Sequence, residues 1–265
     1  MKAISLMYHD VVERDRSDAS GFPGADAALY KLDRGQFQNH LRAIAKAVPR
    51  GPISLLNLTE IAPDEPTPLL LTFDDGGKSA FTFIADALEE VGWRGHFFIA
   101  ANYIDTPSFV SAEEIRKLKR RGHIIGSHSS SHPLRMSNYS WDEMYKEWTT
   151  SIEKLSDIVG ERVTVASVPG GHYSDDVAKT ASLAGIERLF TSEPVMQCWT
   201  VDHCLVLGRY TIQRWTSPMI AADLASGKIA PRVRQFLFWN AKKASKAVGG
   251  RYYLKIRRSF FGTTT

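Results

Sequence analysis

Short apolar segments alternate with capped helical segments along most of this chain, and this alternation constrains the fold more than any other feature of the sequence. Apolar runs of strand length occupy residues 2–8, 69–73, 96–100, 123–127, 163–168, 186–190 and 205–208. Parallel strands need long crossover connections, which are usually helices, so the alternation is typical of a parallel α/β fold. Because it continues through most of the chain, we expect a distorted (β/α) barrel of about seven parallel strands.

Capping residues mark where the intervening helices begin. Ser111 with Glu114, and Ser140 with Glu143, have the Ser-x-x-Glu spacing of a capping box, in which each side chain binds a backbone N–H group of the other residue. Apolar residues at helical spacing follow both pairs, and Gly160 supplies the residue type that commonly ends a helix. Similar helical spacing follows two further capping residues, Asp33 and Ser79.

The composition suits a globular protein of one large domain with an appendage. Of its 265 residues, 43% are hydrophobic and 23% are charged, which argues against wholesale disorder. No apolar run approaches the ~18–20 residues of a membrane-spanning helix, and the apolar stretch at residues 3–8 is shorter than the core of a signal peptide. The two cysteines, Cys198 and Cys204, fit neither a disulfide framework nor a cysteine-based zinc site. We therefore expect a cytoplasmic protein.

Charge is distributed unevenly along the chain. The 33 Lys and Arg residues exceed the 29 Asp and Glu residues, for a net charge of +4. Ten of the basic residues, and no acidic one, lie in residues 228–265, which leaves a mildly acidic body. We therefore divide the chain into a barrel of residues 1–227 and a basic, aromatic-rich helical tail of residues 228–265.

The tail combines helical spacing with basic and aromatic residues. Val233, Phe236 and Leu237 recur at helical spacing before a break at residues 249–250, and aromatic residues alternate with cations beyond it. This combination suits an anionic membrane surface, so we expect a peripheral protein at the inner face of the membrane. Packing of the tail on the acidic barrel is the alternative, and nucleic acid binding is not expected because no nucleic-acid module accompanies the charge. A chain shortened to the barrel is expected to keep its activity on a soluble substrate.

Polar residues directly follow four of the predicted strands. They are Asp74-Asp75-Gly76-Gly77 after residues 69–73, His128 to His132 after residues 123–127, Pro169-Gly170-Gly171-His172 after residues 163–168, and His9 after the first strand. The C-terminal ends of barrel strands lie on one rim, where the active sites of such folds are found. The sequence therefore predicts one site built from carboxylates, histidines and a glycine-rich turn.

His128 and His132 have the spacing of a metal-binding pair. Four residues apart on a helical turn, both imidazoles would lie on the same side, and a carboxylate would complete a two-His, one-carboxylate site. Asp74 and Asp75 would point to opposite sides of a strand, so both reach the site only if the chain turns there, as the glycine pair that follows permits. A surface turn beside unrelated loop histidines is the alternative, but the coincidence at neighbouring strand ends favours a metal site.

Two of these segments resemble the first two motifs of the polysaccharide deacetylases, carbohydrate esterase family four. Residues 72–76, Thr-Phe-Asp-Asp-Gly, match the first motif letter for letter, and residues 122–132, Gly-His-Ile-Ile-Gly-Ser-His-Ser-Ser-Ser-His, are similar to the second. The resemblance covers roughly residues 4–215. It implies that Asp75, His128 and His132 bind a divalent metal ion, for which we expect Zn²⁺. It also implies that Asp74 is the general base.

The third motif of the family is only partly present. Its usual form is Arg-x-Pro-Tyr, whereas residues 167–170 read Ser-Val-Pro-Gly, so the Arg that orients the base is missing. The resemblance still implies that a backbone N–H group of Pro169, Gly170 and Gly171 donates to the oxyanion, as the corresponding turn does in the family.

The late Leu-x-His motif, which supplies a catalytic histidine in the family, is not recognisable either. Arg209 is the candidate to replace the missing cation, and His172 and His9 are further candidates for the substrate site. Since no late histidine takes the role of general acid, we expect Asp74 to perform both proton transfers.

The function expected from these residues is that of a metal-dependent N-deacetylase, a hydrolase acting on a non-peptide C–N bond. It would remove the N-acetyl group from an N-acetylhexosamine unit, such as N-acetylglucosamine, of a glycan or of a lipid-linked glycan. Hydrolysis of another C–N bond, such as a cyclic amide, is the first alternative. A sugar-binding protein with weakened catalysis is the second, because the Arg and the late His are missing. Release of acetate with a free amine product separates the first function from the others.

Overall fold

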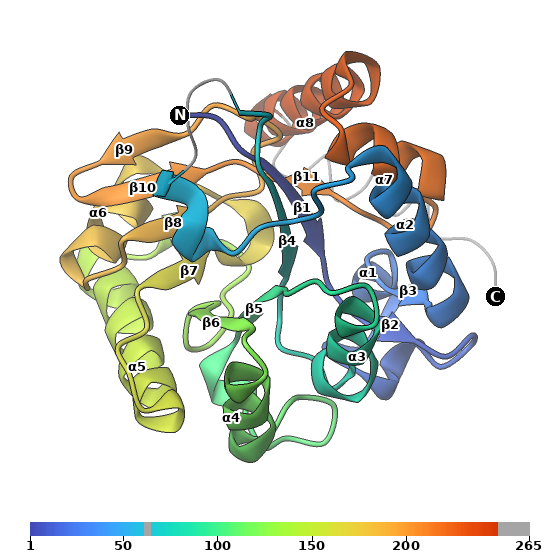
Figure 1. Ribbon diagram of the computed structural model, residues 1–265. Helices are drawn as coiled ribbons and strands as arrows, with labels where there is room; N and C mark the ends of the chain where they lie inside the picture. Colours follow the sequence, from blue (N-terminus) through green and yellow to red (C-terminus); the bar gives the residue numbers. More distant parts are fainter. Residues whose placement is uncertain (61–64, 249–265) are drawn as a thin grey trace, which may run out of the picture.

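A nine-stranded sheet forms the centre of the computed structural model (Figure 1), which describes residues 1–60 and 65–248. In spatial order the strands are β11 (Tyr210–Thr211), β1 (Ile4–Tyr8), β4 (Leu69–Phe73), β5 (His96–Ile99), β6 (Ile124–Ser127), β7 (Val165–Ser167), β8 (Arg188–Phe190), β10 (Cys204–Leu207) and β9 (Trp199–Val201). Every neighbouring pair is parallel except β9 with β10. The sheet is therefore the parallel α/β sheet that the alternation predicts, with one antiparallel strand at its edge.

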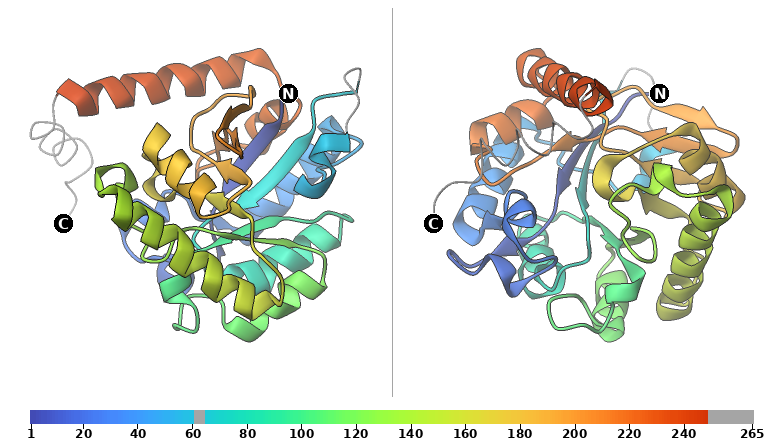
Figure 2. Two further views of the ribbon diagram at one scale, coloured as in Figure 1. Left: turned by 90° about the vertical axis from the view of Figure 1, so that its left-hand side faces the viewer. Right: turned by 180° about the vertical axis from the view of Figure 1, so that it is seen from behind.

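The sheet curls into an open barrel (Figure 2), which confirms the predicted fold class. Its two ends are joined through the chain itself, because β10 pairs with β8, β11 pairs with β1, and only Gly208 and Arg209 lie between β10 and β11. A Cβ atom on Gly208 would lie 2.4 Å from the carbonyl oxygen of Glu193, so this position has no room for a side chain. We call residues 208–209 the seam of the barrel.

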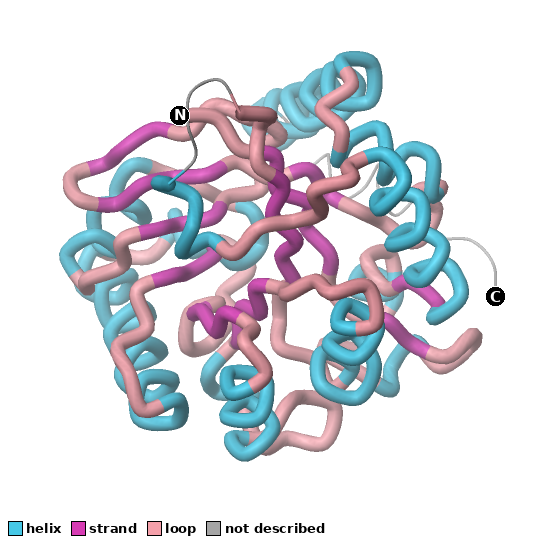
Figure 3. The backbone as a smooth tube through the Cα atoms, in the orientation of Figure 1, coloured by secondary structure: helices cyan, strands magenta, loops and turns pink. Residues whose placement is uncertain are grey.

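Helices cover the outside of the sheet (Figure 3). The main ones are α2 (Arg34–Ala47), α3 (Ala85–Glu89) after a π-helical turn (Ala80–Ile84), α4 (Ala112–Arg120), α5 (Trp141–Val159), α6 (Asp175–Leu183), α7 (Pro218–Ala225) and α8 (Ile229–Val248). Both predicted capping boxes are formed, and α5 ends at Gly160, whose φ of 77° is left-handed. The smaller elements are α1 (Ala25–Ala28), the two-stranded sheet of β2 (Val11–Val12) and β3 (Leu32–Asp33), and short 3₁₀ turns at Ser17–Ala19, Leu55–Glu60, Ala101–Tyr103, Met136–Asn138 and Pro169–Gly171.

Side chains of the central strands β1 and β4 to β7 are buried on both faces, as a helix-covered parallel sheet requires. In β4 every residue is buried: Leu71 and Phe73 join a core cluster with α2, whereas Leu70 joins a second cluster that includes Phe98 and Phe190. The guanidinium of Arg209 lies over the rings of Phe98 and Phe190, at 5.7 and 5.9 Å from their centroids. Two aromatic rings of this second cluster therefore pack against the guanidinium of Arg209 at the C-terminal rim.

The helix predicted at the start of the tail is α8, which begins at Ile229, directly after the expected boundary between residues 227 and 228. The basic aromatic segment of residues 251–261, on which part of the membrane prediction rests, lies outside the described residues. Across the part of the chain that the structure does describe, no helix has the length and apolar content to cross a membrane. The sequence did not predict β9, β11, α6 and α7.

Candidate metal centre and substrate pocket

The two carboxylates at the end of β4 reach the same rim because the chain turns at the second of them. The N–H group of Asp74 still donates to Tyr8 O at 3.0 Å and so continues the pairing with β1. Asp75 then has a φ of 74° and Gly76 a φ of 79°. A left-handed non-glycine residue is strained, and such strain is common at functional sites. The turn that the sequence analysis required is present, and it begins one residue before the glycine pair.

The two histidines are brought together by a loop and not by a helix, so the predicted helical turn is wrong. Residues 128–132 follow β6 without helical structure. Ser129 and His132 have φ values of 62° and 56°, which turn the chain back on itself. The imidazole rings of His128 and His132 nevertheless lie 5.0 Å apart, measured between their centroids.

A carboxylate of α5 holds this loop. The N–H groups of Ser130 and Ser131 donate to Glu147 Oε2 at 2.9 and 2.8 Å, and the Ser131 hydroxyl donates to Glu147 Oε1 at 2.6 Å. The N–H group of His132 donates to Ser129 Oγ at 3.1 Å. Backbone groups that a helix would satisfy internally therefore find side-chain partners, which is why the irregular loop is stable here.

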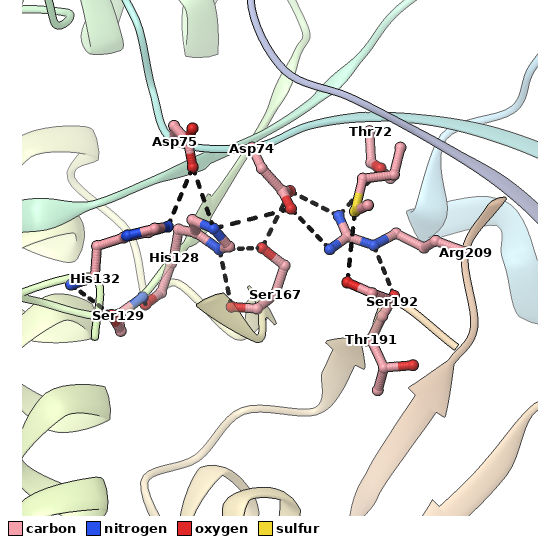
Figure 4. Close-up of polar contacts among 12 residues, drawn as sticks. Thr72, Asp74, Asp75, His128, Ser129, His132, Ser167, Thr191, Ser192 and Arg209 are labelled. Atoms are coloured by element: carbon pink, nitrogen blue, oxygen red, sulfur yellow. Dashed lines mark hydrogen bonds and ion pairs between the residues drawn. The ribbon is translucent and has the colours of Figure 1, made fainter. Parts of the chain in front are cut away.

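Asp75, His128 and His132 form a compact set of metal-binding atoms (Figure 4). Asp75 Oδ1 lies 3.4 Å from His128 Nε2 and 3.3 Å from His132 Nε2. All three donor atoms lie within 4.8 Å of one another. Two imidazole nitrogens and one carboxylate oxygen suit Zn²⁺ and similar divalent ions, and this set leaves coordination positions open. These residues therefore fit a catalytic metal site.

The electrostatics of the same three residues favour a cation. Burial raises the pKa of Asp75, but hydrogen bonds from His128 and His132 outweigh burial and hold that pKa well below its usual range. Burial lowers the pKa of His128, whereas the charge of Asp74 and the hydrogen bond to Asp75 raise it further than burial lowers it. Asp74 and Asp75 thus remain ionised, and their negative charge favours a cation between the two imidazole rings.

Ser167 orients His128 for metal binding. His128 Nδ1 lies 3.1 Å from Ser167 O and 2.6 Å from Ser167 Oγ. A carbonyl oxygen only accepts, so Nδ1 carries a proton, which leaves Nε2 as the nitrogen that would bind a metal ion in place of its hydrogen bond to Asp75. The Ser167 hydroxyl in turn donates to Asp74 Oδ1 at 3.2 Å.

Arg209 holds the other carboxylate, Asp74, from the seam of the barrel. Nη1 donates to Asp74 Oδ1 at 2.6 Å and Nη2 donates to Asp74 Oδ2 at 2.8 Å, while Nε donates to Thr191 O at 2.9 Å. Arg209 is 0% exposed. Burial raises the pKa of Asp74, but the charge of Arg209, together with that of His128, lowers it below its usual value. The charge that the sequence lacks at residue 167 is therefore supplied by Arg209, which was the candidate for this replacement.

The pocket above these groups has a volume of about 740 Å³. The candidate site residues that line it are His9, Asp74, Asp75, His128, His132, Gly170, Gly171 and His172. Arg209 and Pro169 do not line it. Arg209 therefore lies beneath Asp74 and not among the groups that face the substrate.

The turn after β7 presents two glycines to the pocket. Pro169 has no N–H group, so only Gly170 and Gly171 could donate a hydrogen bond from this turn. Their φ values are 65° and 68°, which other residues rarely adopt. A Cβ atom on Gly170 would also lie 2.4 Å from Leu134 O, so the glycine is required at this point.

His9 follows β1 and lies in the wall of the pocket. Its ring packs on Tyr30 at a centroid distance of 4.8 Å. Within the described residues, Nδ1 of His9 is buried and has no hydrogen-bond partner. Burial lowers the pKa of His9, and the charges of Asp75 and Asp74 only partly oppose this. The imidazole of His9 is thus neutral near pH 7, and its buried Nδ1 has no hydrogen bond within the described residues.

Several residues of the site were missed by sequence reasoning. Ser167 could have been found, because it occupies the first position of the altered third motif. Glu147 and Phe22, whose ring lies 4.5 Å from that of His132, carry no local signal because they come from other elements. Trp239 of α8 also lines the pocket, and its sequence position resembles that of any apolar helix residue.

Comparison with known proteins agrees with this geometry. Residues 62–189 match the family model described as polysaccharide deacetylase. The peptidoglycan-N-acetylmuramic acid deacetylase of Bacillus subtilis is 28% identical over 138 residues, which are 51% of this chain and 50% of that protein. The peptidoglycan-N-acetylglucosamine deacetylase of Listeria monocytogenes is 29% identical over 136 residues, which are 51% of this chain and 26% of that protein.

The fold is shared with solved deacetylase structures. A Streptococcus pyogenes deacetylase in complex with acetate has a TM-score of 0.68 and 18% sequence identity, covering 82% of this chain and 95% of that chain. This chain spans about half or less of the length of the curated relatives it matches. The matched segment contains Asp74, Asp75 and both histidines of the metal centre. Residues 62–189 of the chain therefore form a polysaccharide deacetylase domain, set in the fold of the solved deacetylases.

Proposed function

We propose that this protein is a metal-dependent hydrolase that removes the N-acetyl group from an N-acetylhexosamine unit of a glycan. The observation that carries the proposal is the arrangement of Asp74, held in the fork of Arg209, beside the Asp75, His128 and His132 set at the base of one pocket. A metal site beside an ionised carboxylate contains the groups that amide hydrolysis needs. The relatives named above, which are deacetylases of peptidoglycan, support the same reaction class.

Asp75, His128 and His132 would hold the divalent ion, for which Zn²⁺ is the expected metal. Such an ion, when bound, polarises a carbonyl group and lowers the pKa of a bound water toward ~7. Asp74 would act as the general base. Its Oδ2 lies 3.9 Å from His128 Nε2, so the base is adjacent to the metal-binding atoms without being needed as a ligand.

The same carboxylate would return the proton to the leaving amine. Among the described residues that line the pocket, His9 and His172 are the histidines outside the metal-binding set, and burial keeps His9 neutral near pH 7. A neutral His9 would contribute an uncharged ring to the wall around the substrate. The N–H groups of Gly170 and Gly171 would donate to the oxyanion, which is the role expected for this turn.

The substrate would be a carbohydrate chain and not an isolated acetamide. Pockets for ligands of considerable size have volumes of ~300–1,000 Å³, and the volume here is about 740 Å³. Aromatic side chains in the wall, Phe22, Tyr30, Tyr103, Tyr173 and Trp239, suit sugar rings. A lipid-linked glycan as the substrate, and a cytoplasmic site of action, remain predictions from the sequence.

The direct test is to offer a panel of N-acetylated sugars and to measure acetate together with the mass of the product. Deacetylation would lower the product mass by 42 units and release one acetate for each free amine formed. Binding without acetate release would support the sugar-binding alternative. Hydrolysis of a cyclic amide without acetate would support the other hydrolase. Either result, with the metal present, would overturn the proposal.

A further inference from the structure

A side chain of α8 forms hydrogen bonds with the backbone N–H and C=O groups of the edge strand β11, as a neighbouring strand would. The N–H group of Thr211 in β11 donates to Gln235 Oε1 at 3.1 Å, and Gln235 Nε2 donates to Thr211 O at 2.9 Å. Arg232 Nε donates to the hydroxyl of Tyr210 at 2.9 Å. Figure 2 shows α8 as a long helix lying across one side of the barrel. The side chains of α8 thus satisfy a free strand edge.

This attachment brings a tryptophan of α8 to the substrate pocket. Trp239 follows Gln235 by four residues, so both side chains lie on the same face of the helix. Trp239 is partly buried and lines the pocket together with Thr211, to which Gln235 is bonded. The first turns of the predicted tail therefore belong to the pocket wall.

Another aromatic side chain of the pocket is fixed in position by its own contacts. The hydroxyl of Tyr173 accepts a hydrogen bond from Trp199 Nε1 at 3.2 Å and donates to Asp175 Oδ1 at 3.3 Å. Its ring meets that of Trp199 edge to face at 5.7 Å. Phe22, by contrast, packs on His132 at the metal centre. The pocket is thus lined by Phe22 beside the metal-binding residues and by Tyr173, which is held in place by other contacts.

We propose that α8 forms a sugar subsite of this enzyme, in which the indole of Trp239 packs on the face of an uncharged pyranose ring next to the unit that loses its acetyl group. One face of a pyranose ring presents C–H groups, which favour an aromatic surface from which water is excluded. The identity of the bound sugar rests on the proposed function. The subsite makes the enzyme select chains of at least two sugars over single N-acetylhexosamines.

The test compares Trp239→Ala with Trp239→Phe and with the control Phe238→Ala, all in the full chain. Phe238 is the adjacent residue of the same helix and is 70% exposed. Acetate release is measured with N-acetylglucosamine and with its β-1,4-linked tetramer. Trp239→Ala should raise KM for the tetramer about tenfold, which corresponds to about 1.4 kcal/mol and lies within the range of an aromatic contact, and leave kcat within about twofold. Trp239→Phe should restore much of the affinity, and Phe238→Ala should have no effect.

Gln235→Ala provides a second variant, because it loosens α8 without removing the indole. It should raise KM for the tetramer in the same direction by a smaller factor. Equal changes in KM for the monomer and the tetramer, an unchanged KM in Trp239→Ala, or an equal effect of Phe238→Ala would overturn the subsite.

Direct binding separates this inference from the proposed function. If the wild-type chain releases no acetate from any sugar, the function fails on its own. Titration calorimetry of the tetramer with the full-length wild-type and Trp239→Ala proteins then decides the subsite. Binding that weakens about tenfold in the variant supports it, and identical or absent binding overturns it.

Discussion

At the scale of single residues, the pairing of Asp74 with Arg209 sets the charge on which the chemistry depends. Both oxygens of a buried carboxylate are engaged by one guanidinium, at 2.6 and 2.8 Å. Removal of Arg209 would take away the charge that lowers the pKa of Asp74, and burial would then raise that pKa. Because a general base must be ionised, a raised pKa moves its working range to higher pH.

We predict that Arg209→Met moves the acid limb of the profile of kcat/KM against pH to higher pH and lowers turnover at pH 7 by about 10²-fold. The matched control is Arg188→Met. Arg188 lies in β8, and its guanidinium forms an ion pair with the exposed Glu187. An acid limb at the wild-type position in Arg209→Met would contradict the role of Arg209.

The same variant should unfold more easily, because a buried carboxylate loses its partner. A loss of about 3–5 kcal/mol in the free energy of unfolding is expected for Arg209→Met, measured by urea titration with a chelator present. The double variant Asp74→Asn with Arg209→Met removes both charges and should recover part of that loss. Additive effects of the two substitutions would show that the pair is not coupled.

The contribution of His9 to substrate binding can be tested by removing its imidazole. Since burial lowers the pKa of His9, its imidazole is already neutral at pH 7 and does not titrate as the pH rises above 7. We predict that His9→Ala raises KM several-fold while the pH profile keeps the single acid limb of Asp74. Should the wild-type profile show an alkaline limb that disappears in His9→Ala, His9 would be the general acid instead.

The sequence predicted which residue types form the site, but not which of them are in contact with one another. The motif of residues 72–76 predicted the carboxylates, and Arg209 was the candidate for the missing cation. Its partner could not be derived, because the contact with Asp74 joins residues 135 positions apart. Such contacts depend on how the two ends of the sheet meet at the seam, which no local pattern encodes.

At the scale of elements, prediction succeeded where the signal was local and failed where distant groups decide the backbone. Both capping boxes formed because their partners are three residues apart. The histidine loop was wrongly predicted as a helical turn, because Glu147 of α5 accepts the N–H groups of this loop. The two-residue strand β11 is too short to leave an apolar pattern.

The turn after β7 offers a test at this scale. Gly170→Ala introduces a Cβ atom 2.4 Å from Leu134 O in addition to the cost of a left-handed φ of 65°. The matched control is Gly92→Ala, because Gly92 has a φ of 76° and a Cβ atom added there would have no neighbour within 4 Å. We expect Gly92→Ala to cost about 1 kcal/mol with full activity. Gly170→Ala should cost about 2–3 kcal/mol and lower kcat, and equal behaviour of the two variants would contradict the proposed oxyanion role.

At the scale of the whole molecule, the structure changes what the tail is expected to do. From the sequence, the barrel of residues 1–227 is expected to keep its activity on a soluble substrate without the tail. Trp239 lies in the pocket and Gln235 binds β11, so a chain ending at residue 227 would lose part of its substrate site. We now expect such a chain to bind longer glycans less tightly.

The predicted membrane contact would be made by the exposed apolar residues of α8. Ile229, Val233 and Leu237 are 73%, 47% and 62% exposed and recur at helical spacing. No acidic residue lies in residues 228–265, so a second copy of this helix would bring like charges together, whereas anionic lipid complements them. The full-length protein should sediment with vesicles of phosphatidylglycerol and phosphatidylcholine at low salt and be released as salt rises. Equal binding to vesicles of phosphatidylcholine alone, or none to either, would contradict it.

In the proposed function, one metal centre and one carboxylate base together release acetate. The most direct measurement determines bound metal and acetate release in the same samples of wild type, His132→Ala and Asp74→Asn. We predict that His132→Ala loses most of its metal and its activity, because it removes one of three ligands. Asp74→Asn should keep its metal and lose about 10²-fold or more in turnover, because an amide cannot take a proton from water. Full metal occupancy in His132→Ala, or near-normal acetate release by Asp74→Asn, would contradict the proposed function.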